Sequence, residues 1–64
     1  MKASDKKKLQ RAIAYIDKAY DCISDVIGSL EKQGSDKGVL ELEDVQREIS
    51  NQQYYINEVI IAEQ

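Results

Sequence analysis

A seam of apolar residues at heptad spacing constrains this chain more than any other feature. Its members follow one another at alternating intervals of four and three residues: Leu9, Ile13, Ile16, Tyr20, Ile23, Ile27 and Leu30. This spacing aligns the side chains along one side of an α-helix. An apolar stripe on a helix needs another helix to cover it, so the seam predicts a fold in which helix packs on helix.

The first helix is predicted to run from about Asp5 to Gln33. Ser4 or Asp5 is expected to cap its start, because either side chain can accept hydrogen bonds from the free N–H groups of a first turn. Residues 34–38 form the only cluster of helix-breaking residues, and Gly34 favours the left-handed conformation that ends a helix. So short a connection predicts two antiparallel neighbours.

The second helix is predicted from about Gly38 to Ala62. Its expected seam consists of Leu42, Val45, Ile49, Gln52, Ile56 and Val59, with Ile60 beside it. Folding the chain about Ser35 would place residue i opposite residue 71 − i. Gln52 would then face Tyr20, and we expect these two residues to form a buried, hydrogen-bonded layer, because a buried amide or phenol needs a partner.

The chain has 64 residues, enough for a single all-α domain but too few to bury much surface alone. The sequence lacks the residues for the disulfides or the structural metal site that usually stabilise small proteins. Cys22 is the only cysteine, which precludes an internal disulfide, and there is no histidine for a zinc site. Oligomerisation is the remaining route, so the sequence predicts a two-helix antiparallel hairpin that assembles into a homodimeric four-helix bundle.

The predicted contact surface consists of apolar residues that one hairpin cannot bury. A second row at three-four spacing lies beside the first seam, and the end of the second helix is apolar on almost every side. We expect a second copy, or another helical protein, to bind there. The residues are Ala12, Tyr15, Ala19, Cys22, Val26, Tyr54, Tyr55, Ile60 and Ile61.

Several classes of function find no support in the sequence. Without histidine, the common nucleophilic and acid–base arrangements cannot form, and no glycine-rich phosphate loop is present. We therefore expect no enzymatic activity, no cofactor and no bound metal. A net charge of −3 argues against general affinity for nucleic acid. No apolar run is long enough to span a membrane, and a cytoplasmic location is expected.

Charge is distributed unevenly along the first helix. Lys6, Lys7, Lys8 and Arg11 form a basic cluster, which solubilises the helix start or contacts an anionic partner. It is expected to meet Glu58 and Glu63 at the open end of the hairpin. Asp17, Asp21 and Asp25 form an acidic line, interpreted either as a solvated surface or as a contact for a basic helix.

In length and layout the chain resembles the plasmid Rop proteins, helical hairpins that dimerise into four-helix bundles and bind RNA through their first helices. It is also similar in outline to the small hairpin co-chaperones of type III secretion needles. These resemblances imply a small regulator, adaptor or chaperone-like subunit that binds proteins. The alternative is a Rop-like RNA-binding regulator that uses the basic start of the first helix.

Overall fold

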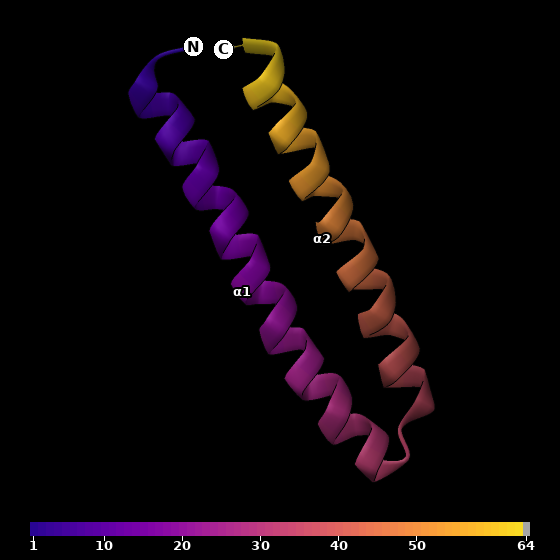
Figure 1. Cartoon of the computed structure of the whole chain (residues 1–64). Helices are drawn as coiled ribbons and strands as arrows, with labels where there is room; N and C mark the ends of the chain where they lie inside the picture. Colours follow the sequence, from indigo (N-terminus) through magenta and orange to yellow (C-terminus); the bar gives the residue numbers. More distant parts are fainter. Residues whose placement is uncertain (64) are drawn as a thin grey trace.

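The computed structural model describes residues 1–63 and contains two helices, α1 (Ala3–Gln33) and α2 (Asp36–Glu63). The helices pack against each other as an antiparallel hairpin, with both ends of the chain at the same end of the molecule (Figure 1). The all-α class and the hairpin predicted from the sequence are therefore confirmed.

α1 begins two residues earlier than the capping pattern predicts. Lys2 occupies the N-cap position in extended conformation, and no side chain caps the helix. The carbonyl of Lys2 accepts a hydrogen bond from the N–H group of Lys6 at 3.0 Å. Asp5 is instead part of the first turn, where its negative charge suits the helix dipole.

The turn is shorter than predicted, because two residues are enough to reverse the chain. Gly34 adopts the left-handed conformation, with φ of 75°, as the sequence predicts. Its N–H group donates to the carbonyl of Glu31 at 3.1 Å, and that of Ser35 donates to Leu30 at 3.0 Å. These two bonds form a Schellman motif, which satisfies the last carbonyls of α1. α2 then starts at Asp36 rather than at Gly38.

The predicted seam of α1 faces α2 at every position except Tyr20, which is 40% exposed. The predicted seam of α2 is wrong at three positions, since Val45, Gln52 and Val59 are all exposed. The residues of α2 that face α1 also repeat at three-four spacing and lie one row further round the helix. They are Val39, Leu42, Gln46, Ile49, Gln53, Ile56 and Ile60.

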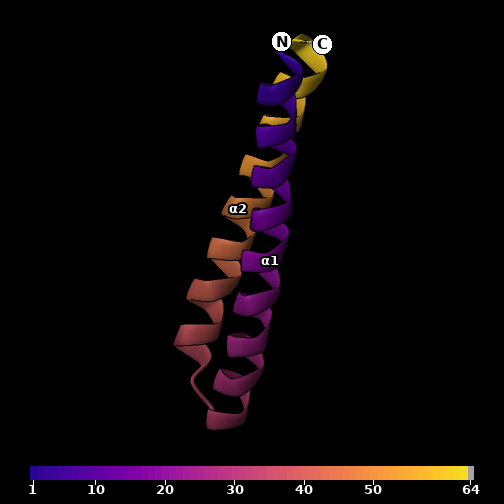
Figure 2. The same ribbon diagram turned by 90° about the vertical axis from the view of Figure 1, so that its left-hand side faces the viewer.

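The seam between the helices is thin. Among residues 1–63, Ile27 and Ile60 are the only buried apolar residues, and no large side chain is fully enclosed. Seen edge-on, the hairpin is one layer of two helices (Figure 2). Its radius of gyration is 14.9 Å, whereas a compact domain of this length has one of roughly 11 Å. The hairpin therefore leaves large apolar residues of both helices in contact with solvent.

Neither helix in the described residues is long and apolar enough to cross a membrane.

Candidate interaction surface

Two glutamines, Gln46 and Gln53, join the helices through a repeated set of hydrogen bonds. Gln46 Nε2 donates to the carbonyl of Tyr20 at 3.0 Å and to Ser24 Oγ at 2.8 Å. Seven residues further along α2, Gln53 Nε2 donates to the carbonyl of Ile13 at 3.1 Å and to Asp17 Oδ1 at 2.7 Å. Each amide thus reaches a backbone carbonyl of α1 and the side chain one helical turn beyond it.

This repeat fixes the register of the hairpin. Gln46 lies level with the midpoint of residues 20 and 24, and Gln53 with the midpoint of residues 13 and 17. Residue i therefore faces approximately residue 68 − i, three less than the predicted value of 71 − i. The difference arises because the turn takes only two residues and α2 starts earlier.

The predicted Tyr20–Gln52 layer is replaced by this glutamine pair. Gln52 is exposed, and Tyr20 takes part only through its backbone carbonyl. Gln46, which is absent from the predicted seam, is the buried polar residue, with 8% of its surface exposed. Its donors are satisfied, as a buried amide requires. The signal that could have identified it is the matched seven-residue spacing of Ser24 and Asp17 on the other helix.

The second apolar row of α1 lies beside the seam and faces solvent. Tyr15 and Val26 are 61% and 49% exposed. Ala19 and Cys22 are exposed as well, and Ala12 is half-buried at the edge of the seam. Within a single hairpin, four of these five residues have no helix to cover them, as the sequence predicts, and Ala12 is covered in part.

α2 contributes a matching row. Val45, Tyr55 and Val59 are 39%, 61% and 48% exposed, and Ala62 continues the row toward the end of the helix. Gln52 and Glu48 interrupt it. Ile60, which was predicted to be available for a partner, belongs instead to the seam and is only 6% exposed.

The two rows lie on the same side of the hairpin. A twofold rotation about an axis perpendicular to the plane of the hairpin superimposes one antiparallel helix on the other. This rotation does not exchange the two sides of the plane. Rows that lie one residue before the seam on each helix are therefore on the same side of the hairpin. Together they form what we call the apolar face. It consists of Ala12, Tyr15, Ala19, Cys22 and Val26 of α1 and of Val45, Glu48, Gln52, Tyr55, Val59 and Ala62 of α2, so that one charged residue lies within it.

The other flank of the seam is polar. The glutamine pair bonds toward this side, to Ser24 and Asp17. An open pocket here is lined by Tyr20, Glu43, Gln46, Arg47, Ser50 and Asn51. We call this side the polar face. The residues that flank the seam on it are Gln10, Asp17, Ser24 and Glu31 of α1 and Glu43, Ser50 and Asn57 of α2, all exposed.

Tyr54 and Ile61, which were predicted to belong to the contact surface, do not lie on the apolar face. They are seven residues apart and share an exposed row on the other flank of α2, 60% and 55% exposed. The rings of Tyr54 and Tyr55 meet edge to face, with centroids 5.6 Å apart. Tyr55, a member of the apolar face, thus contacts its own neighbour in the sequence.

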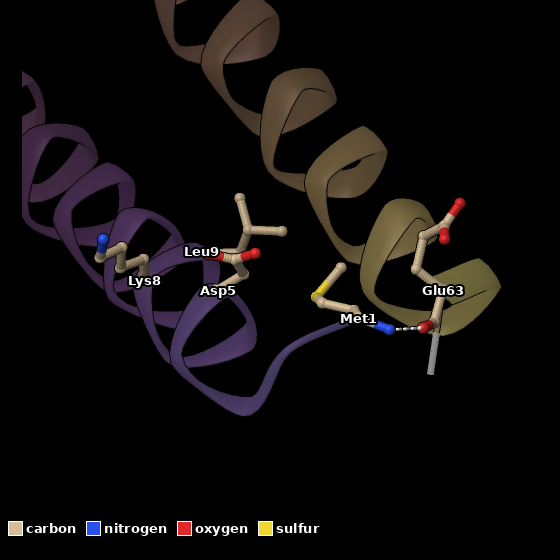
Figure 3. Close-up of a pocket in the computed structure, with 5 residues that line it drawn as sticks. All are labelled: Met1, Asp5, Lys8, Leu9 and Glu63. Atoms are coloured by element: carbon tan, nitrogen blue, oxygen red, sulfur yellow. Dashed lines mark hydrogen bonds between the residues drawn. The ribbon is translucent and has the colours of Figure 1, made fainter.

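The open end of the hairpin brings the start of α1 to the end of α2. The amino group of Met1 donates to the carbonyl of Glu63 at 2.6 Å, and Met1, Asp5, Lys8, Leu9 and Glu63 line one pocket (Figure 3). No ion pair joins the basic cluster to Glu58 or Glu63 among residues 1–63. Lys7, Lys8 and Arg11 are exposed, whereas Lys6 is half-buried.

The remaining chemical groups are dispersed. Cys22 carries a free thiol on the apolar face. Asp17 differs from Asp21 and Asp25 because it accepts the hydrogen bond of Gln53, which gives one member of the acidic line a role within the hairpin. Within residues 1–63, no three Cys, Asp or Glu side chains gather closely enough to hold a metal ion.

Comparison with known proteins adds no relative to this picture. No protein-family model matches the chain, and neither a curated protein nor a solved structure matches it.

Proposed function

We propose that this protein is a non-enzymatic protein–protein interaction module whose apolar face binds a second copy of the chain, giving a homodimeric four-helix bundle. The observation that carries the proposal is the difference between the two sides of the hairpin. Tyr15, Val26, Tyr55 and Val59 stand exposed on one side. On the other side polar side chains flank the seam, and the large exposed apolar residues Leu40, Tyr54 and Ile61 lie in the outer row of α2. Such segregation is typical of a helix pair that buries one side only.

The amount of exposed surface supports the same conclusion. The chain exposes 4965 Å². A compact monomer of the same mass, 7.3 kDa, exposes roughly 4,200 Å². The surplus of roughly 800 Å² equals what one partner buries in a protein–protein interface of standard size. Packing a second layer of helices on the apolar face would remove this surplus.

The test compares two glutamate substitutions at neighbouring exposed positions of α2. Val59→Glu places a charge on the apolar face, and Asn57→Glu places the same charge on the polar flank. We expect the parent and Asn57→Glu to sediment as dimers in analytical ultracentrifugation. Val59→Glu should weaken the dimer by a factor of ten or more, because an unpaired charge would have to be desolvated in the interface.

Helicity measured on the same samples separates loss of assembly from loss of folding. A parent protein that remains monomeric at all concentrations while fully helical would contradict the homodimer. Equal weakening by the two substitutions would contradict the assignment of the contact to the apolar face.

A further inference from the structure

We propose that the second copy packs on the apolar face head to tail, with the turns of the two hairpins at opposite ends of the bundle. This inference rests on the proposed homodimer and specifies its arrangement. Two hairpins that share their broad faces have two symmetric ways to stack. Either their turns lie at the same end, so that α1 covers α2 of the second copy, or their turns lie at opposite ends, so that α1 covers α1.

The charge distribution along the hairpin distinguishes these arrangements. The open half, residues 1–16 and 49–63, holds five Lys/Arg and three Asp/Glu, a balance of +2. The half next to the turn, residues 17–48, holds four Lys/Arg and nine Asp/Glu, a balance of −5. Stacking with the turns together would place two halves that each carry a net charge of −5 against each other. Head-to-tail stacking places each positive half against a negative one, and such complementarity favours one orientation over the other.

The sizes of the side chains on the apolar face lead to the same arrangement. Tyr15 and Tyr55 are its largest residues, and both lie toward the open end. Toward the turn the face carries the smaller Cys22, Val26 and Val45, with Glu48 beside Val45. With the turns together, four tyrosines would meet in one region. Head-to-tail packing sets each pair of tyrosines against small residues, which is how well-packed layers interdigitate.

The dimensions of the hairpin permit this contact over its whole length. The molecule measures 48 × 15 × 9 Å along its principal axes. Its broad face of 48 by 15 Å offers roughly 700 Å² per copy, close to the share of each partner in an interface of standard size. The row of α1 on this face extends from Ala12 to Val26 with Ala19 at its centre. In a head-to-tail dimer, Ala19 therefore lies against Ala19 of the second copy.

Distance measurement between spin labels tests the arrangement. The labelled variant combines Cys22→Ser with Lys37→Cys, which puts a nitroxide on the exposed first turn of α2. Head-to-tail packing predicts a separation close to the hairpin length of 48 Å. Stacking with the turns together predicts a separation of roughly 10–20 Å, set by the spacing between packed helices.

Sedimentation of the same labelled sample shows which proposal a negative result concerns. A dimer with the long separation supports the head-to-tail arrangement. A dimer with the short separation overturns it and leaves the proposed homodimer intact. A monomeric sample overturns both.

Disulfide formation provides a second test, independent of long distances. Ala19→Cys in the Cys22→Ser background should form a covalent dimer under mild oxidation, because the two thiols meet at the centre of the contact. Lys18→Cys in the same background is the matched control, since the adjacent position faces away from the apolar face. It should cross-link no faster than by random collision. Equal rates for the two variants would overturn the placement of α1 on α1.

Discussion

At the scale of single residues, the glycines of this chain have opposite roles. Gly34 has a positive φ of 75°, which ends α1. Gly28 lies inside α1, five residues before its last residue, and a Cβ atom added there would meet nothing within 4 Å. A Cβ atom at Gly38 would lie 3.1 Å from Leu30 Cδ1, so the absent side chain lets Leu30 approach the start of α2.

We expect Gly28→Ala to raise the free energy of unfolding by about 1 kcal/mol, because alanine loses less backbone entropy in a helix and has room here. Gly34→Ala should lower it by about 1–2 kcal/mol, since the left-handed conformation strains a residue that carries a Cβ atom. Urea denaturation at one fixed protein concentration measures both. Two shifts of the same sign would contradict this reading of the backbone.

At the scale of the helices, the glutamine pair fixes the register of the hairpin but buries less apolar surface than aliphatic residues would. Gln46 and Gln53 occupy positions of α2 where leucine would bury more apolar surface. The groups that accept these hydrogen bonds would keep other partners without the glutamines. The carbonyls of Tyr20 and Ile13 lie inside a continuous helix and accept an intrahelical bond as well. Ser24 and Asp17 are exposed to solvent. Buried polar residues at seam positions are known to specify one alignment at a cost in stability.

Gln46→Leu is therefore expected to raise the free energy of unfolding by about 1 kcal/mol, because it leaves no buried group unpaired and adds apolar contact.

The double substitution Gln46→Leu with Gln53→Leu should add further stability and broaden the distribution of assembled masses, as alternative alignments become accessible. Asn51→Leu is the control, since its side chain is exposed, and it should change stability by less than about 0.5 kcal/mol. Calorimetry and sedimentation provide the two readouts. A destabilised Gln46→Leu would mean that the amide bonds outweigh apolar burial.

At the scale of the whole molecule, the free thiol of Cys22 is a probe for the proposed dimer. Cys22 is exposed on the single hairpin and lies within the apolar face. A dimer that covers this face would protect it. The rate of modification by a thiol reagent should therefore rise on dilution in proportion to the monomer fraction.

The matched control for this experiment is Asp21→Cys in the Cys22→Ser background, because residue 21 lies outside the apolar face. Its modification rate should not change with protein concentration. If Cys22 reacted equally fast at high and low concentration in a sample that sediments as a dimer, the apolar face would not be the contact.

The sequence alone determined the elements of this protein. The heptad spacing from Leu9 to Leu30 and the helix-ending Gly34 were enough to specify two antiparallel helices, because both signals act within a few residues of the chain. The second row of α1, from Ala12 to Val26, was also predictable. Its three-four spacing places it beside the seam, and a single partner helix covers the seam but not the row next to it.

Only the tertiary structure decided which row of α2 faces α1. Two overlapping rows of α2 share Leu42, Ile49 and Ile56, and both are apolar enough to form a seam. The more apolar choice, through Val45 and Val59, was the wrong one for the hairpin. The deciding contacts are the bonds from Gln46 and Gln53 to acceptors on the other helix. A row read along one helix cannot reveal such pairings, because they depend on register, and register is a property of two helices together.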